Sequence, residues 1–140
     1  MKFTPSVEEQ PQPDDIQMLE DQLNAYNMRR AQAYDGRSLA IFLRDDQGHV
    51  VAGLSAYTWA GLCEVEIVWV PEELRGQGLG SRLLHAAEQE ARARGCSLIV
   101  LSTYSFQAPA FYQKHGYTIA GQINDCPPGH TDYYFHKRLV

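Results

Sequence analysis

A run of glycines at alternate positions is the segment of this chain whose residue types point most clearly to chemistry. The run reads Arg75-Gly76-Gln77-Gly78-Leu79-Gly80, and Ser81 follows it. Because glycine has no side chain, backbone N–H groups in such a run can converge on an anion, and the start of a helix adds a partial positive charge. Arg75 would add a fixed positive charge and Ser81 a hydroxyl. The pattern predicts a site for a diphosphate.

Two other nucleotide-binding patterns fail on this run, and one structural alternative stays open. A phosphate-binding P-loop ends in Gly-Lys-Ser/Thr, whereas Gly80 is followed by Ser81-Arg82. A dinucleotide fingerprint would place its third glycine at Ser81 and expects an acidic residue about 20 positions later. Residues 99–103 there contain no acid. A glycine-rich turn that only reverses the chain is the alternative, but alternate glycines before a helix are hard to explain by turning alone.

Two glutamates stand two positions apart in an extended run. Glu64 and Glu66 lie between Leu62 and Val70, so strand alternation places both on one face. The same alternation predicts four apolar side chains on the other face: Cys63, Val65, Ile67 and Trp69. Two carboxylates on a central strand are costly unless they reach water. They therefore line a wet cleft, bind a substrate cation or lie on an exposed sheet face.

Hydrophobic periodicity predicts the elements that position these residues. A short strand around Lys2–Thr4 precedes a helix that opens at Pro13, with Ile16, Leu19, Leu23 and Tyr26 on one stripe. Further strands are predicted at 38–44, 50–57, 62–70, 97–103, 117–123 and 133–139, and further helices at 81–94 and 108–115. On the helix at 81–94, Glu88 with Arg92 and Glu90 with Arg94 are predicted as exposed acid–base pairs. The order is typical of a mixed α/β sheet.

Composition sets limits on the class of protein. The 140 residues fit one compact domain, and 44% hydrophobic with 21% charged residues is ordinary for a globular chain. The net charge of −5 argues against nucleic acid as a partner, and no apolar run is long enough to span a membrane. With no secretory signal and three widely spaced cysteines, Cys63, Cys96 and Cys126, we expect a cytoplasmic protein without a metal site.

Two motifs together resemble the GCN5-related N-acetyltransferase (GNAT) family. The glycine run looks like that family's Q/R-x-x-G-x-G/A signature. The segment Ala108-Pro109-Ala110-Phe111-Tyr112-Gln113-Lys114-His115-Gly116-Tyr117 is similar to its A-x-x-F-Y-x-x-x-G-F/Y motif. The resemblance implies the acyl-CoA N-acyltransferase fold: a mixed, mostly antiparallel central sheet of about six to seven strands flanked by helices. It implies one N-acetyltransferase domain over residues 1–140.

The resemblance also implies a binding site for acetyl-CoA. The loop Arg75, Gly76, Gln77, Gly78, Leu79, Gly80 and Ser81 would hold the pyrophosphate. The pantetheine arm would pair with the strand at Val68, Trp69 and Val70, in a cleft between 68–70 and 97–103. Ser105 occupies the position of an asparagine that the family usually places before the second motif, where it contacts the cofactor or the helix start.

The resemblance further implies direct attack by a bound amine on the thioester. Tyr112, at the family's tyrosine position, is the candidate acid for the leaving thiolate, with packing beside Phe111 as the alternative. Glu66, and after it Glu64, is the candidate base that removes a proton from the incoming ammonium. The expected acceptor is a small-molecule primary amine, although its identity stays open among polyamines, aminoglycoside-like drugs, amino acids, lysines and protein N-termini. The alternatives are a CoA-binding module without catalysis and an enzyme with a macromolecular acceptor. Dimers are common in the family, and the sequence leaves the oligomeric state open.

Overall fold

The computed structural model describes residues 1–139. Its helices and strands are, in chain order, α1 (Pro13–Ala31), β1 (Arg37–Arg44), β2 (Val50–Trp59), β3 (Leu62–Trp69), the 3-10 helix η1 (Glu72–Leu74), α2 (Leu79–Ala93), β4 (Leu98–Tyr104), α3 (Pro109–Lys114), β5 (Thr118–Asn124) and β6 (Thr131–Arg138). Every predicted element except the strand at Lys2–Thr4 is present, with ends that differ by a few residues.

The described chain divides into two compact units, Met1–Tyr34 and the part from Asp35 onward. In the first unit, α1 begins at Pro13 as predicted and ends where Gln32 takes a left-handed conformation with φ 53°. The predicted strand at Lys2–Thr4 is wrong: these residues are irregular, since they have no partner strand to satisfy their backbone groups. A single domain over residues 1–140 stays a prediction. No helix in residues 1–139 combines the length and hydropathy that crossing a bilayer requires.

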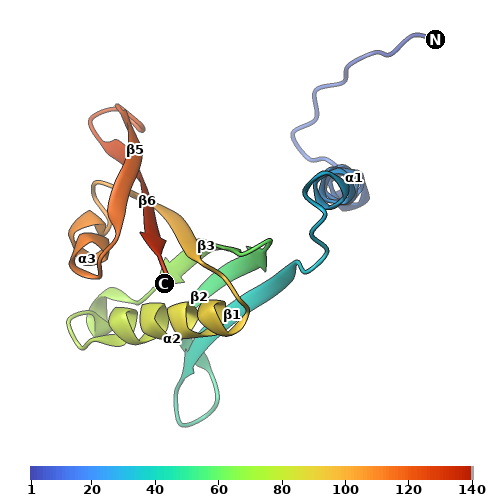
Figure 1. The fold of residues 1–140 in the computed structure, drawn as a ribbon. Coiled ribbons are helices and arrows are strands. Elements are labelled where there is room, and N and C mark those ends of the chain that lie inside the picture. Colours follow the sequence, from blue (N-terminus) through green and yellow to red (C-terminus); the bar gives the residue numbers. More distant parts are fainter. Residues whose placement is uncertain (140) are drawn as a thin grey trace. The chain divides into compact units, whose positions relative to one another are not determined.

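The second unit is built on a six-stranded sheet with the order β1-β2-β3-β4-β6-β5 (Figure 1). Of its neighbouring pairs, only β3 with β4 is parallel. The structure therefore confirms the predicted mixed, mostly antiparallel sheet. The parallel pair in the middle places the carboxyl ends of β3 and β4 at the same edge, and the residues that follow both strands come together there.

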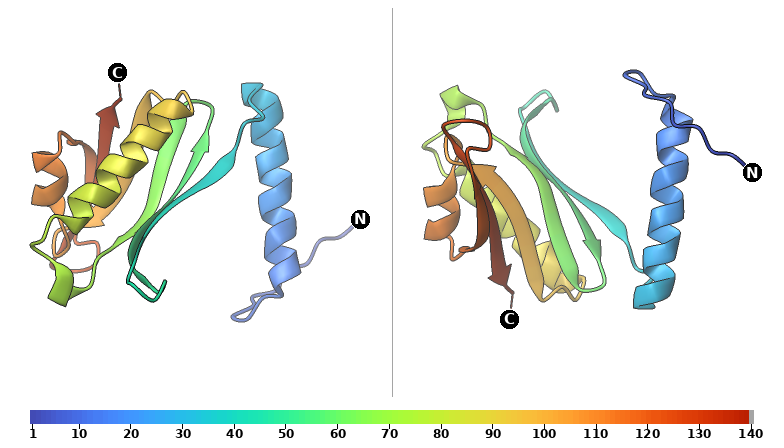
Figure 2. Two further views of the ribbon diagram at one scale, coloured as in Figure 1. Left: turned by 90° about the horizontal axis from the view of Figure 1, so that it is seen from below. Right: turned by 90° about the horizontal axis from the view of Figure 1, so that it is seen from above.

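Helix α2 covers one face of the sheet, as both views in Figure 2 show. Its fully buried side chains are Leu83, Leu84, Ala87 and Ala91. They pack with the sheet residues Leu54, Cys63, Ile99 and Phe135 in one core cluster. Because this core fixes which side of each strand faces α2, it also defines the opposite face, which we call the open face.

Glu88 of α2 is not on the exposed side, where the sequence predicted it. Only 5% of Glu88 is exposed. Its Oε2 accepts a hydrogen bond from the Tyr117 hydroxyl at 2.9 Å, and its Oε1 lies 2.8 Å from Lys137 Nζ. Lys137 also donates to the carbonyl of His115 at 2.9 Å. A buried carboxylate is stable only when it is paired, and here the pairing fixes the end of α3 against α2 and β6.

Candidate active site

Strands β3 and β4 pair over only part of their length. Their register covers Leu62 with Leu98, Cys63 with Ile99 and Glu64 with Val100. Beyond that point β3 continues beside β2, and β4 continues beside β6. The facing edges of the two strands are thus unpaired with each other after Glu64 and Val100, and the strands diverge in Figure 2. The predicted split is present, but its β4 side begins at Leu101, because residues 98–100 are still paired.

The opening of the split coincides with a β-bulge in β3. Val65 pairs with Ala56 of β2 and Ile67 pairs with the preceding Ser55, so Glu66 has no partner in the β2–β3 register. A bulge adds one residue to a strand and shifts the alternation of its side chains. All residues of β3 beyond Glu66 therefore exchange faces relative to a regular strand.

The exchange corrects one prediction about β3. The pattern predicts Ile67 and Trp69 on the buried face with Cys63, and this prediction is wrong. Ile67 is 59% exposed and Trp69 is 56% exposed. Instead, Val68 and Val70 pack against the core. The exposed side of β3 thus carries Glu64, Glu66, Ile67 and Trp69, while the side chains of the predicted cofactor-contacting residues Val68 and Val70 face inward.

The backbone amides of the glycine loop are unpaired. Among residues 1–139, none of the N–H groups of 76–81 has a hydrogen-bond acceptor, and the first donor that returns to the loop is Arg82, to the carbonyl of Gly78 at 3.1 Å. No side chain caps α2. Gly76 and Gly78 have φ values of 82° and 80°, and a Cβ added to either would meet no atom within 4 Å. Gln77 and Leu79 stand between the glycines. The amides are thus available to an anion.

The third glycine of the loop, Gly80, is required for packing and not for a special backbone conformation. Gly80 does not have a positive φ, and a Cβ added to it would lie 3.3 Å from Cζ of Phe111. The absence of a side chain at Gly80 therefore allows the first turn of α2 to approach α3 closely. This contact places the second motif beside the glycine loop.

Arg75 is held against the end of β3. Its Nε donates to the carbonyl of Val70 at 2.9 Å, and its Cζ lies 5.4 Å from the centroid of the Trp69 ring. Glu72 Oε1 is 4.0 Å from its Nη1 at an exposed position. The guanidinium thus joins β3 to the loop and keeps a positive charge there, while the carbonyl of Val70 is already in use.

Ser81 and His115 connect the first turn of α2 to the end of α3. Ser81 Oγ lies 2.9 Å from His115 Nε2, and the His115 ring packs at 4.7 Å from that of Phe111. When Nε2 carries the proton, the Ser81 oxygen accepts it and the hydroxyl hydrogen is available to a ligand. The predicted contribution of Ser81 to anion binding is compatible with this arrangement.

Ser105, at the position that the resemblance gives to an asparagine, and the nearby Gln107 are both hydrogen-bonded within the protein. Ser105 Oγ accepts a hydrogen bond from the Thr131 amide at 3.0 Å, which ties it to β6. Gln107 Oε1 accepts from the Tyr104 amide at 2.7 Å and from the Thr103 hydroxyl at 3.3 Å. The Thr103 oxygen in turn accepts the amide of Ala108 at 3.3 Å, which supports the start of α3.

Tyr112 is buried, but its hydroxyl has no hydrogen-bond partner among residues 1–139. The residue is 7% exposed, and its ring packs against those of Phe111, Tyr117 and Phe135. No buried side-chain oxygen or nitrogen in residues 1–139 lacks a hydrogen bond. Since no hydrogen bond of the Tyr112 oxygen is found, that atom is in reach of solvent. Burial raises the pKa of Tyr112 to about 12, so the group is a neutral phenol with a proton to donate.

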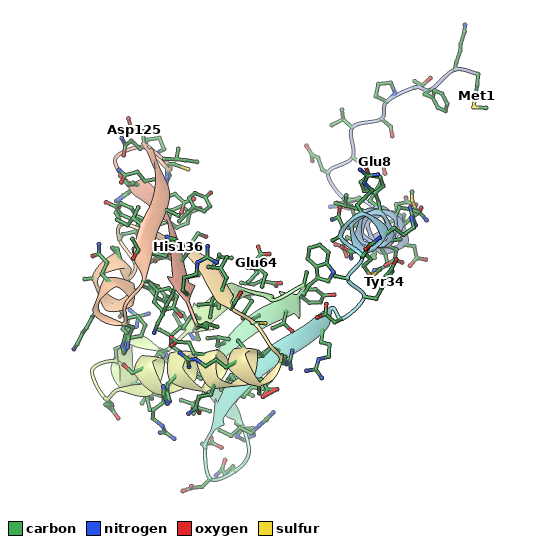
Figure 3. The ribbon with its side chains drawn as sticks, viewed as in Figure 1. Met1, Glu8, Tyr34, Glu64, Asp125 and His136 are labelled. Atoms are coloured by element: carbon green, nitrogen blue, oxygen red, sulfur yellow. The ribbon has the colours of Figure 1, made fainter. Side chains whose placement is uncertain are left out.

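Glu64 and His136 lie on the open face in the same row of the sheet. Glu64 pairs with Val100, and Val100 pairs with His136 of β6. Residues in one cross-strand row point to the same side, and two strand spacings separate their Cα atoms by about 10 Å. Figure 3 shows both side chains on the side away from α2. Sequence reasoning missed His136, because only the register of β6 brings it opposite the glutamates.

The cysteines of the core are poor nucleophiles. Cys63 is fully buried, and burial, with a smaller effect of Cys96, raises the pKa of its thiol to about 11. Burial likewise raises the pKa of Cys96. Both therefore stay protonated at neutral pH, when a thiolate would be needed for attack. No group of three or more His, Cys, Asp or Glu side chains that could hold a metal ion occurs in the described chain.

Comparisons with known proteins agree with this arrangement. The model of the acetyltransferase (GNAT) family matches residues 4–117. An acetyltransferase of Agrobacterium fabrum is 37% identical over 121 residues, covering 86% of this chain and 88% of the relative. The blasticidin-S acetyltransferase of Streptomyces morookaense is 37% identical over 116 residues, covering 80% and 85%. A crystal structure of an acetyltransferase from Bacillus cereus superposes with a TM-score of 0.81 at 31% identity, covering 95% and 97%.

The match of the family model spans the glycine loop, the split between β3 and β4 and the motif that carries Tyr112. The fold of these elements and the extent of the similarity to the relatives indicate the same family. On this evidence, the chain belongs to the GNAT family of acetyltransferases.

Proposed function

We propose that this enzyme transfers the acetyl group of acetyl-CoA to a primary amine of a small molecule, by direct attack while both substrates are bound. The observation that carries the proposal is the set of unpaired amides at residues 76–81, which follow the end of β3 at which the split from β4 is open. The amides can bind an anion, and the separation of the two strands leaves their edges free to pair with an extended chain. A diphosphate joined to a thioester-bearing arm combines both requirements.

The residues of the loop and of β3 fit acetyl-CoA in chemistry. The amides of residues 76–81, with the hydroxyl of Ser81 and the charge of Arg75, would hold the pyrophosphate. The edge of β3 around Val68 and Trp69 would pair with the amides of the pantetheine arm. When bound, acetyl-CoA supplies an activated acyl group and a thiolate that can leave. The family membership and the name of the blasticidin-S relative support an acetyl transfer to a small molecule.

Direct attack requires no nucleophile from the protein. The amine nitrogen forms the bond to the acetyl carbon, the carbon–sulfur bond breaks, and the ammonium loses a proton. The raised pKa values of Cys63 and Cys96 disfavour an acyl-enzyme on either thiol. An unpaired N–H of β3 in the split would stabilise the oxygen of the tetrahedral intermediate.

Tyr112 acts in this proposal as a hydrogen-bond donor to the departing sulfur. A thiol has an ordinary pKa near 8.5, and burial raises the pKa of Tyr112 to about 12. Complete transfer of its proton would be uphill by about 3.5 pKa units, or roughly 5 kcal/mol. The phenol therefore stabilises the thiolate without giving up its proton, and solvent or the proton released by the amine completes the step.

The base for the ammonium is Glu66, with Glu64 as the second choice. Both carboxylates are exposed beside the split, and the bulge places Glu66 where the strand edges separate. Either carboxylate would accept the proton directly or through a water molecule. Glu66→Gln and Glu64→Gln distinguish them: the variant of the base should lower kcat by roughly tenfold to a hundredfold without changing the affinity for CoA. Full activity in both variants would remove the glutamates from the mechanism.

A thiol-release assay with acetyl-CoA and a panel of small amines tests the proposal. We expect CoA release that depends on the amine, and an N-acetylated product in mass spectrometry. Tight binding of acetyl-CoA without turnover on any amine would favour a CoA-binding module. Acetylation of protein N-termini or lysines, with no small amine accepted, would favour a macromolecular acceptor.

A further inference from the structure

Three aromatic rings form an ordered cluster on the surface at the end of β4. The rings of Tyr104 and Phe106 stack at 5.2 Å with 9° between their planes, and His130 meets Phe106 edge-on at 4.9 Å and 74°. We call these three residues the aromatic shelf. Phe106 is nevertheless 58% exposed. A large apolar ring that is held in place by two neighbours and still faces solvent is a surface on which another flat group can stack.

The shelf lies at the edge of the sheet where the split opens. Ser105 donates its amide to the carbonyl of Thr131 at 2.8 Å, which fixes the residues after β4 against the start of β6. Tyr104 is two positions from Ser102 and pairs with Asp132, while the alternating residues Leu101 and Thr103 are buried under α2. Its side chain is thus on the open face, as those of Glu64 and Glu66 are.

A buried carboxylate without a cation adjoins the shelf. Asp132 is 9% exposed and stands directly opposite Tyr104 in the register of β4 and β6. The hydroxyl of Tyr134 donates a hydrogen bond to Asp132, and this bond raises the pKa of Tyr134. Yet Asp132 takes part in none of the ion pairs found in residues 1–139. The Tyr134 hydroxyl satisfies part of the hydrogen-bonding capacity of this carboxylate but brings no positive charge, and a bound cation would offset the remaining cost of its burial.

The basic groups of β6 and the imidazoles near the shelf, His130 and His136, form no ion pair with Asp132 within residues 1–139. Lys137 is on the face of α2, where it is bound to Glu88, and Arg138 is six residues further along β6. The glutamates across the split have the same sign as Asp132. The open face at this edge of the sheet is therefore acidic and aromatic, a combination that favours cations with flat apolar parts.

From this juxtaposition we propose that the aromatic shelf and Asp132 form an acceptor subsite for a flat ring that carries a second positive charge. The ring stacks on Phe106, and its charge pairs with Asp132. The amine that is acetylated then extends toward Glu66 and the split. The inference rests on the proposed function and specifies its substrate class: small aromatic or heteroaromatic amines with two cationic groups.

Four amines separate the contribution of the ring from that of the second charge. Two of them carry two ammonium groups: p-xylylenediamine, which has an aromatic ring, and 1,6-diaminohexane, which has none. The other two carry one ammonium group: benzylamine, which has the ring, and hexylamine, which does not. We expect p-xylylenediamine to have the highest kcat/KM. The ring should contribute about 2- to 10-fold and the second charge about 10- to 100-fold.

Two variants, each with a matched control, assign these contributions to residues. Phe106→Leu should reduce the preference for p-xylylenediamine over 1,6-diaminohexane. Phe42→Leu should not, because Phe42, with a similar exposed fraction of 51%, lies on β1 at the far edge of the sheet. Asp132→Asn should reduce the preference for the diamine over benzylamine, whereas Asp46→Asn, in the β1–β2 turn, should not. The ratios of kcat/KM are measured with each variant, so that a general loss of stability cancels.

The outcomes separate this inference from the proposed function. The expected preferences, each reduced by its own variant, support the subsite. Acetylation of all four amines with equal kcat/KM, or preferences that neither variant changes, overturns the subsite while the amine acetyltransferase stands. Acetylation of other small amines in the panel, with none of these four accepted, also overturns the subsite while the proposed function stands. Binding of acetyl-CoA with no acetylation of any amine overturns both.

Discussion

The glycine loop and the open face beside the split between β3 and β4 offer a ligand different kinds of group. The loop offers the backbone amides of residues 76–81, and its glycines have no side chains. The open face offers side chains: Glu64, Glu66, Asp132 and the aromatic shelf. The loop is therefore suited to any anion of fitting shape, whereas the open face has a definite charge and apolar character.

This difference between backbone and side-chain groups suggests how one fold can keep its cofactor while its acceptor changes. An amide cradle tolerates few substitutions, because almost any side chain or negative charge fills it. Carboxylates and rings on an open sheet face can be exchanged singly without altering the backbone. We therefore expect variants on the loop side to change the affinity for CoA, and variants on the open face to change the choice of amine.

Gly78→Asp should have the largest effect. The new side chain enters the open space beside the amides, and its charge repels the pyrophosphate while it competes for the N–H groups. Loss of two charge-assisted hydrogen bonds costs about 3–6 kcal/mol, which corresponds to roughly 10²- to 10⁴-fold weaker binding of CoA in calorimetry. The control is Gly48→Asp, since Gly48 also has a positive φ, of 85°, and open space around it, but lies in the β1–β2 turn. Unchanged affinity in Gly78→Asp would remove the loop from the site.

Tyr112→Phe tests the side chain for which we propose a part in the chemical step. It removes one hydroxyl from a packed ring, so the affinity for CoA should be nearly unchanged. Without the donor to the departing sulfur, kcat should fall by roughly tenfold to a thousandfold. Pre-steady-state release of CoA measures the step directly. A variant with full activity would show that Tyr112 contributes only packing.

Ser81→Ala should have a smaller effect on the loop side. The variant loses one hydroxyl donor and leaves all the amides in place. We expect a 2- to 10-fold weaker affinity for CoA, the value of one hydrogen bond. Ser38→Ala, on the exposed side of edge strand β1, is the control. A loss as large as that of Gly78→Asp would mean that side chains, and not the backbone, dominate on this side as well.

The pH dependence of Tyr112→Phe should be the smallest effect. Because burial raises the pKa of Tyr112 to about 12, the phenol stays protonated below that pH and loses its proton only above it. The ratio of wild-type to Tyr112→Phe turnover should therefore be constant from pH 7 to pH 10. With an ordinary pKa near 10, half of the donors would be lost at pH 10, and the ratio would fall about twofold. Stopped-flow rates at both pH values decide between the two.

Features fixed by local sequence were predictable, and those fixed by pairing between strands were not. Alternate glycines give open amides regardless of the rest of the chain, so the loop at 76–81 follows from its own residues. The need for glycine at position 80 does not follow from the loop itself, because it depends on contact with Phe111, which is 31 residues away. Likewise, Glu88 resembles any exposed glutamate of an i,i+4 pair until the fold brings Tyr117 and Lys137 to it.

The open face shows the same limit more clearly. Alternation in β3 predicted the exposure of Glu64 and Glu66 correctly but failed after the bulge, which exists only in the register with β2. The positions of His136 and Asp132 on the open face follow from their pairing with Val100 and Tyr104 in the register of β4 and β6. A strand pattern gives the alternation of side chains, but the register decides which neighbours they have.

The unpaired position of Glu66 makes this residue an addition to β3 that the packing of the strand does not need. Without it, the pairs Val65–Ala56 and Ile67–Ser55 would follow each other directly, as in a regular strand. Val68 and Val70 would still face inward, and Ile67 and Trp69 would still face outward. Deleting Glu66 should therefore spare the core while it removes one carboxylate and the local kink where the strand edges part.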